Sequence, residues 1–215
     1  MARLLETTFI QGPAGRLEAL HEAPDEDKRI ERAAVICHPH PLHGGTLHNK
    51  VVFRLARAAR RSGAAVLRFN FRGVGASSGS FDDGMGEQDD LRAALAYMSE
   101  RYPGLPLMAG GFSFGSRVGL RVVCQDARIE RFVAAGTPVK HGNWSFLAHC
   151  ACPKFFIHST EDVHGDRVTM EAAFAAAAAP KQLVWIEAED HFFRGAVDEF
   201  EEQAYEAWTA GISSR

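Results

Sequence analysis

Apolar residues along the chain follow two different patterns. The first is a short, nearly continuous apolar run bounded by turn residues, which predicts a buried strand. These runs span residues 32–39, 64–71, 105–112, 131–136, 153–159 and 182–188. The second is apolar spacing typical of an amphipathic helix, often closed by glycine or proline. These segments span residues 49–63, 87–104, 114–125, 166–180 and 196–211. Strands that alternate with helices predict an α/β fold: a mostly parallel central sheet with helices on both faces.

The first two apolar segments do not fit that alternation. Residues 3–11 and 15–23 have strand character, and the residues around Gly12–Gly15 join them closely. We therefore expect a hairpin that adds an antiparallel edge to the sheet. A chain of 215 residues without an internal repeat or linker is long enough for one sizeable core. The sequence predicts a single domain over residues 1–215.

Composition and charge narrow the class of protein. The chain is 46% hydrophobic and 24% charged, with a formal net charge of −3, as in ordinary globular proteins. It has no basic stripe with interleaved aromatic residues, so we expect no nucleic-acid partner. The first residues lack the apolar stretch of a signal peptide, and the run over 172–180 is too short to span a bilayer. We expect a cytoplasmic protein without a membrane partner; its oligomeric state stays open, a homodimer included.

The cysteines are few and irregularly placed, at positions 37, 124, 150 and 152. Such placement does not resemble a disulfide framework, so we expect reduced thiols. Cys150 and Cys152 are separated by one residue, which is one short of a C-x-x-C pair. No second pair accompanies them, and we expect neither zinc nor redox chemistry there.

A serine stands where a predicted strand meets a predicted helix. Gly111, Ser113 and Gly115 form a G-x-S-x-G pattern at that junction. In a nucleophile elbow, a sharp turn lifts the hydroxyl above the sheet edge, and small flanking residues allow the backbones to cross closely. The alternative is a serine that only caps the following helix. The context favours Ser113 as a nucleophile.

A serine nucleophile needs a base, and the base needs an acid. His191 is the only histidine after the last predicted strand, so we expect it to be the base. We expect the acid in the loop after the strand at 153–159. Asp162 lies a short turn beyond that strand, at a suitable distance for His191. Asp166 is the alternative acid, although it could instead cap the helix that follows.

The stretch CHPHPLHGGTLHNK at residues 37–50 is rich in histidine. A metal site is one interpretation, but the prolines at 39 and 41 hold the first histidines in extended backbone, and no H-E-x-x-H spacing occurs. The better interpretation is an oxyanion loop after the third strand. Because proline has no N–H, His40 is the expected donor from this loop, with Phe114 supplying the second N–H.

The segment RFNFRGVGASSGS at residues 68–80 is predicted to be scaffold. Its glycines do not match G-x-G-x-x-G, and the acidic stretch that follows would repel a pyrophosphate. We expect Arg72 to hold this loop by hydrogen bonds, with anion binding as the alternative. No metal or organic cofactor is expected.

Together, the blocks at residues 37–52, 67–79, 111–116 and 189–195 resemble the α/β-hydrolase superfamily. More narrowly, the chain is similar to small bacterial serine hydrolases with little or no cap that are related to dienelactone hydrolases. The resemblance implies a nucleophile at Ser113, an acid at Asp162, a base at His191 and oxyanion donors at His40 and Phe114. Those relatives are usually carboxylesterases for short acyl esters. Dienelactone hydrolases use cysteine where this chain has Ser113, and the sequence around Asp162 departs from the usual acid motif.

The expected reaction is therefore hydrolysis of short acyl esters through an acyl-enzyme. Two alternatives remain: a serine peptidase or amidase, with Glu161, Asp82 or Asp83 as possible amine-binding groups, and a non-catalytic binding protein on the same fold. The short connection over residues 137–152 predicts an open pocket. The predicted substrate contacts are Leu42, Trp144, Phe146 and Phe192. Trp144 and Phe146 could instead pack on the core.

Overall fold

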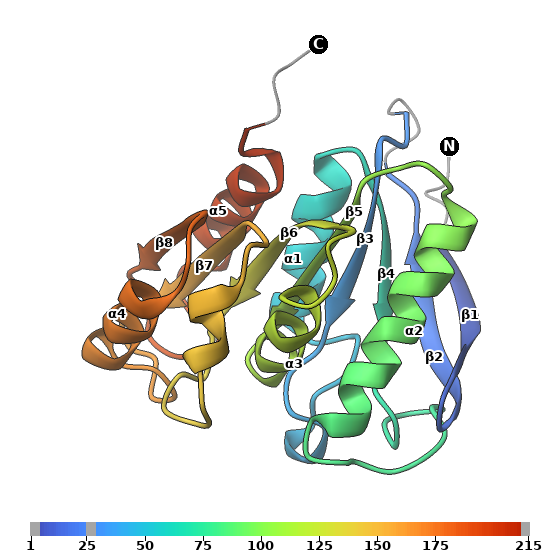
Figure 1. Ribbon diagram of the computed structural model, residues 1–215, viewed down its shortest axis with the longest axis horizontal. Coiled ribbons are helices and arrows are strands. Elements are labelled where there is room, and N and C mark those ends of the chain that lie inside the picture. Colours follow the sequence, from blue (N-terminus) through green and yellow to red (C-terminus); the bar gives the residue numbers. More distant parts are fainter. Residues whose placement is uncertain (1–4, 25–28, 212–215) are drawn as a thin grey trace.

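The computed structural model describes residues 5–24 and 29–211, and these form an eight-stranded sheet with the order β1-β2-β4-β3-β5-β6-β7-β8 (Figure 1). The strands are β1 (Leu5–Gly12), β2 (Gly15–Glu22), β3 (Arg32–Cys37), β4 (Ala64–Phe69), β5 (Leu107–Phe112), β6 (Ile129–Ala135), β7 (Lys154–Ser159) and β8 (Lys181–Ile186). From β4 to β8 every neighbouring pair is parallel, as the alternating pattern predicts.

The predicted hairpin forms the antiparallel edge. β1 pairs with β2 in a register that runs from Leu5 opposite Glu22 to Gly12 opposite Gly15. β2 then pairs antiparallel with β4, which joins the hairpin to the parallel part of the sheet. The prediction of this edge is confirmed, apart from residues 3 and 4, which lie outside the described residues.

Helices cover both faces of the sheet (Figure 1). They are α1 (Lys50–Arg61), α2 (Met85–Arg101), α3 (Phe114–Val123), α4 (Arg167–Ala176) and α5 (Val197–Thr209). α1 and α5 pack one core, in which Leu55, Phe200 and Trp208 are fully buried. α2, α3 and α4 pack the other, around Phe132 and Met170. The central strands β4 and β5 are buried along their whole length, because their alternate side chains enter opposite cores.

The connection in which larger relatives insert a cap, between β6 and β7, is short in this protein. The connection from β6 to β7 contains only the short 3₁₀ helix η2 (Ser145–His149). Helix α4 is shorter than the predicted span 166–180, because it ends at Ala176 and Ala177 is already extended. The residue before Pro180 also disfavours helical backbone. Among the described residues, no helix has the length and apolar character needed to cross a membrane.

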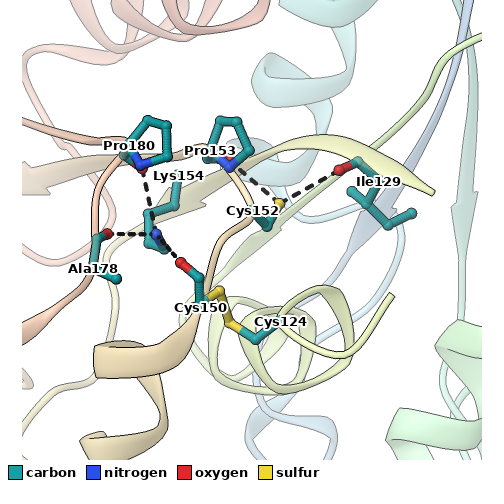
Figure 2. The surroundings of a disulfide bond; sticks show 8 residues. All are labelled: Cys124, Ile129, Cys150, Cys152, Pro153, Lys154, Ala178 and Pro180. Atoms are coloured by element: carbon teal, nitrogen blue, oxygen red, sulfur yellow. Dashed lines mark hydrogen bonds between the residues drawn. A yellow bond between two sulfur atoms is a disulfide. The ribbon is translucent and has the colours of Figure 1, made fainter. Parts of the chain in front are cut away.

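The cysteine prediction was wrong for two of the four residues. Cys124 and Cys150 form a disulfide with a Cα–Cα distance of 4.7 Å (Figure 2). Cys37 and Cys152 are free and buried. Cys124 ends α3 and Cys150 ends η2, so the bond joins two elements that are 26 residues apart in sequence. Spacing alone could not reveal this pairing, because the fold brings the two chain segments together.

Candidate functional site

Ser113 occupies the turn between β5 and α3 in a strained backbone conformation. Its φ is 54° and its ψ is −118°, a region that non-glycine residues rarely adopt. A Cβ on Gly115 would lie 2.6 Å from the carbonyl oxygen of His38. A Cβ on Gly111 would lie 2.8 Å from the backbone nitrogen of Ser116. Both glycines of the motif are therefore needed for close backbone crossing, as a nucleophile elbow requires.

The Ser113 side chain does not cap α3. The backbone nitrogens of Ser116 and Arg117 donate instead to the carbonyl oxygen of Ser113, at 2.9 and 3.1 Å. The Ser113 backbone nitrogen donates to the carbonyl oxygen of Ala135 on β6, at 2.9 Å. The backbone thus holds the turn, and the hydroxyl group stays available at a cavity.

His191 and Asp162 meet at the carboxyl edge of the sheet. His191 Nδ1 lies 2.7 Å from Asp162 Oδ2, although the two residues are 29 positions apart. Asp162 follows β7 and His191 follows β8, so neighbouring parallel strands deliver both side chains to one edge. His191 Nε2 is buried and has no hydrogen-bond partner among the described residues. Such an atom can accept a proton from a group that enters the site.

The ring of His191 also adjoins the serine turn. It lies 4.8 Å from the ring of Phe112, the residue immediately before Ser113. Gly136 follows β6 with a φ of +50°, and a Cβ there would come within 3.0 Å of His191 Cε1. Gly136 therefore leaves the space that the imidazole occupies. The sequence analysis did not single out this glycine, although a glycine at the end of a predicted strand was a usable signal.

Asp162 is held in its ionised form. Burial opposes ionisation, but the hydrogen bond and charge of His191, the charge of His158 and the backbone amide of His164 together lower its pKa. The His164 backbone nitrogen donates to Asp162 Oδ1 at 2.8 Å. An ionised Asp162 accepts the Nδ1–H of His191, which leaves Nε2 as the free acceptor.

His158 contacts both Asp162 and the loop that carries it. Its Nε2 lies 2.7 Å from the carbonyl oxygen of Gly165 and 3.4 Å from Asp162 Oδ2. Burial lowers the pKa of His158, and the charge of Asp162 offsets this only in part. With a proton on Nε2, His158 donates to the carbonyl oxygen of Gly165 and fixes the loop that carries Asp162. The sequence placed His158 on its strand but did not indicate this role.

Asp166, the alternative acid, lies elsewhere. It is the N-cap of α4, where its Oδ1 accepts from the Thr169 backbone nitrogen at 2.9 Å. Lys140 Nζ lies 2.9 Å from its Oδ2. Hydrogen bonds from Thr169 and Lys140 lower the pKa of Asp166 to about 2. The structure thus brings Asp162 to His191, while Asp166 caps a helix.

The histidine-rich loop passes beside Ser113. His38 is fully buried; its Nδ1 donates to Pro39 O at 2.6 Å, and its Nε2 accepts from the Phe71 backbone nitrogen at 3.0 Å. Burial lowers the pKa of His38 to about 4, so the ring is neutral and braces the loop. The rings of His40 and Phe114 lie 5.0 Å apart. Among the described residues, no backbone acceptor contacts the backbone N–H of either residue.

A cavity of about 330 Å³ opens at Ser113. Its lining consists of His40, His43, Ser113, Phe114, Arg117, Pro138, His141 and His164. The sequence analysis did not expect five of these residues at a cavity: His43, Arg117, Pro138, His141 and His164. They come from separate loops and from α3, and only the packed fold places them around one space.

The predicted substrate contacts lie outside that lining. Trp144 and Phe146 pack against each other, with ring centroids 6.0 Å apart, and against the core. The alternative in which they pack on the core is therefore the one observed. Leu42 is exposed on the short 3₁₀ helix η1 (Pro41–His43). Phe192 is half exposed and its ring lies 5.4 Å from that of His191, so it adjoins the base without lining the cavity.

Arg72 has the structural role that the sequence predicted. Its Nε and Nη2 contact the two carboxylate oxygens of Asp90 at 3.0 and 2.8 Å. Asp90 is fully buried and also accepts from the Arg72 backbone nitrogen. This bidentate pair ties the loop after β4 to α2. Across the described residues, no cluster of three or more His, Cys, Asp or Glu side chains could hold a metal ion.

Comparison with known proteins relates most of the chain to hydrolases. Residues 31–151 match the family Hydrolase_4, described as serine aminopeptidase S33. The protein RP471 of Rickettsia prowazekii is 35% identical over 202 residues, which cover 89% of this chain and 84% of that protein.

Two solved structures share the fold closely. One is XC6422 from Xanthomonas campestris, an α/β serine hydrolase without a lid, at 30% identity and a TM-score of 0.89. The match covers 98% of this chain and 97% of that structure. The other is an α/β serine hydrolase homologue from Coxiella burnetii, at 33% identity and a TM-score of 0.89, with 94% and 96% covered.

Proposed function

The chain belongs to the serine aminopeptidase S33 family within the α/β-hydrolase superfamily, and from this premise we propose that it is a serine carboxylesterase for short-chain acyl esters. The observation that carries the proposal is the strained turn of Ser113 at the cavity, together with the His191 imidazole that packs on the preceding Phe112. The Nδ1 of that imidazole contacts Asp162, and its Nε2 is buried without a partner among the described residues. That arrangement suits nucleophilic acyl transfer.

In the proposed reaction, the Ser113 hydroxyl attacks the ester carbonyl. His191 Nε2 takes the serine proton and then gives it to the leaving alkoxide, so that the alcohol departs and an acyl-serine remains. Ionised Asp162 orients the imidazole and stabilises its protonated form. Water then attacks the acyl-enzyme with His191 as base, and the products are a carboxylic acid and free Ser113.

The backbone N–H groups of His40 and Phe114 are the proposed oxyanion donors. The N–H of Phe114 is the first of α3, where intrahelical acceptors are missing and the helix dipole favours negative charge. One such donor contributes on the order of 3 kcal/mol to lowering the barrier. This reaction requires no metal or organic cofactor.

The charge of the cavity favours an esterase over an aminopeptidase. An aminopeptidase needs carboxylates to bind the substrate ammonium group, and Glu161, Asp82 and Asp83 were the candidates. None of these three is among the described residues that line the cavity. Asp82 instead accepts from the Gly86 backbone nitrogen at 3.0 Å, and Asp83 lies beside Arg117. A guanidinium group at the cavity would repel an ammonium group.

The test compares three substrates and one label. We expect hydrolysis of p-nitrophenyl acetate and p-nitrophenyl butyrate, little hydrolysis of an aminoacyl p-nitroanilide, and labelling of Ser113 by a fluorophosphonate. Cleavage of the anilide alone would indicate a peptidase. An absence of both turnover and labelling would indicate a binding protein on the same fold.

A further inference from the structure

The charged and titratable side chains that line the cavity at Ser113 are all of basic type. Five of its lining residues are basic in type: His40, His43, Arg117, His141 and His164. Among the described residues that line it, none is acidic. A cavity of this composition selects against cationic ligands and offers N–H donors to anionic ones.

Arg117 supplies the permanent positive charge. It lies one helical turn after Ser113 on α3, and its guanidinium carbon stacks 5.3 Å from the centre of the Phe114 ring. Its Nη2 donates to Asp83 O at 3.1 Å and lies 3.5 Å from Asp83 Oδ1. Within the part of the chain that the structure describes, no acceptor contacts Nε or Nη1. The guanidinium group can therefore bind a further carboxylate.

Asp83 neutralises Arg117 only weakly. The Asp83 side chain is 89% exposed and contacts the guanidinium group only at the edge of hydrogen-bond range. Exposed ion pairs of this kind add little stability, because water screens both charges. A ligand carboxylate in the cavity would meet Arg117 in a less hydrated setting and would compete with Asp83 successfully.

The histidines line the cavity in two pairs. The rings of His40 and His43 are stacked 4.3 Å apart, and His141 Nε2 lies 3.3 Å from His164 Nδ1. Burial, and then the charges of His43 and Arg117, lower the pKa of His40. Basic groups crowded in this way repel one another when protonated, and a bound anion would relieve that repulsion.

The acidic residues near the cavity already have partners. Asp162 is hydrogen-bonded to His191, and Asp166 pairs with Lys140 at 2.9 Å and caps α4. The positive charge that faces the cavity is therefore left for a ligand.

We infer that the preferred substrates are anionic esters, specifically monoesters of short dicarboxylic acids, with Arg117 binding the free carboxylate. This inference rests on the proposed esterase function. Ser113 and Arg117 line the same cavity of about 330 Å³, so one small ligand can place its ester carbonyl at Ser113 and its carboxylate at Arg117. Hydrolysis breaks the ester C–O bond, water supplies the new carboxylate oxygen, and the products are a dicarboxylate and an alcohol.

The test uses two esters of matched shape. Monoethyl succinate carries a terminal carboxylate, and ethyl 4-methylpentanoate carries an isopropyl group in its place. Ethanol release gives kcat/KM for each. We expect the native protein to favour the succinate by about tenfold or more, the effect of one hydrogen-bonded charge. Equal rates, or a preference for the neutral ester, would overturn the inference.

Variants assign the preference to Arg117. In Arg117→Met we expect the succinate preference to be lost, and in Arg117→Lys to be kept in part, since lysine retains the charge without the planar fork. The matched control is Arg92→Met, which removes one positive charge outside the cavity, where Arg92 pairs with Asp89 at 2.7 Å. A fall in the preference with Arg92→Met, or none with Arg117→Met, would contradict the role of Arg117.

A binding measurement separates this inference from the esterase proposal. In the Ser113→Ala variant, monoethyl succinate should raise the thermal unfolding temperature more than ethyl 4-methylpentanoate does at the same concentration. If neither ester is hydrolysed but this difference is found, the esterase proposal fails and the anion preference stands. If both esters are hydrolysed without any difference in rate or stabilisation, the anion preference fails and the esterase proposal stands.

Discussion

His191 donates its Nδ1 proton to Asp162 across 2.7 Å, which fixes the free nitrogen of the imidazole as a proton acceptor. The pair joins the loops after β7 and β8, the last two strands of the sheet. Asp162 is itself held by the backbone nitrogen of His164 and supported by His158. The position of the His191 imidazole is thus determined by a chain of contacts that runs through the loop after β7.

Replacing the serine should remove activity without unfolding the protein. We expect Ser113→Ala to lower ester turnover by about a thousandfold or more, because the acyl-enzyme can no longer form. Circular dichroism and the thermal midpoint should match those of the native protein, since the turn is held by backbone hydrogen bonds. Ser80→Ala, at an exposed position, is the control. Full activity in Ser113→Ala would mean that another nucleophile operates.

Substitution of the two candidate acids, Asp162 and Asp166, should have very different effects on kcat. Asp162→Asn should lower kcat by about a thousandfold or more, because an amide in this place no longer stabilises the protonated imidazole. Asp166→Asn keeps a helix cap and loses only an exposed ion pair, so its kcat should stay within roughly twofold of native. The measurement is kcat on p-nitrophenyl butyrate for both variants. The reverse order of effects would make Asp166 the acid.

Gly136 should tolerate no side chain. A Cβ there would press on the rings of Phe112 and His191, and displacement of a catalytic group by about 1 Å can cost a hundredfold in rate. We therefore expect Gly136→Ala to lower kcat by about that factor. Gly142→Ala introduces alanine at another positive φ, of 102°, where a Cβ would meet no atom within 4 Å. If both variants lose activity equally, backbone strain rather than contact with His191 is the cause.

His38 should make stability depend on pH. Its pKa is lowered from 6.5 to about 4 by burial, so below pH 6.5 the unfolded chain binds a proton that the folded protein does not. Stability should therefore fall as the pH drops from 6.5 to about 4, by on the order of 3 kcal/mol from this group. Urea unfolding of the native protein and of His38→Gln should show the steeper fall in the native protein. Parallel pH curves would rule out this contribution.

The disulfide between Cys124 and Cys150 can be tested by counting free thiols and by measuring the stability that it contributes. Denatured, unreduced protein should show two reactive thiols, those of Cys37 and Cys152, and reduction should raise the count to four. Closing a loop of this length stabilises a fold by about 3 kcal/mol through the unfolded chain. Urea unfolding of Cys124→Ser should show that loss, and Cys152→Ser should leave the disulfide intact. Four reactive thiols before reduction would contradict the pairing.

The sequence predicted the sheet, the helices and the places of Ser113 and His191, because these depend on local patterns and on strand order. It favoured Asp162 and kept Asp166 as the alternative, since both belong to one loop and only its folded path separates them. The disulfide was missed because two distant elements create it. The basic cavity was missed for a similar reason: His43, Arg117, His141 and His164 become neighbours only when several loops and a helix pack together.

The hairpin of β1 and β2 contributes none of the proposed catalytic or oxyanion groups, all of which follow β3, β5, β7 and β8. Exposed positions on its outer strand β1 can therefore accept labels or surface redesign, whereas the buried Ile10 and Leu17 belong to the same core as Phe114. Immobilisation through the hairpin edge would leave the mouth of the cavity accessible to dissolved esters.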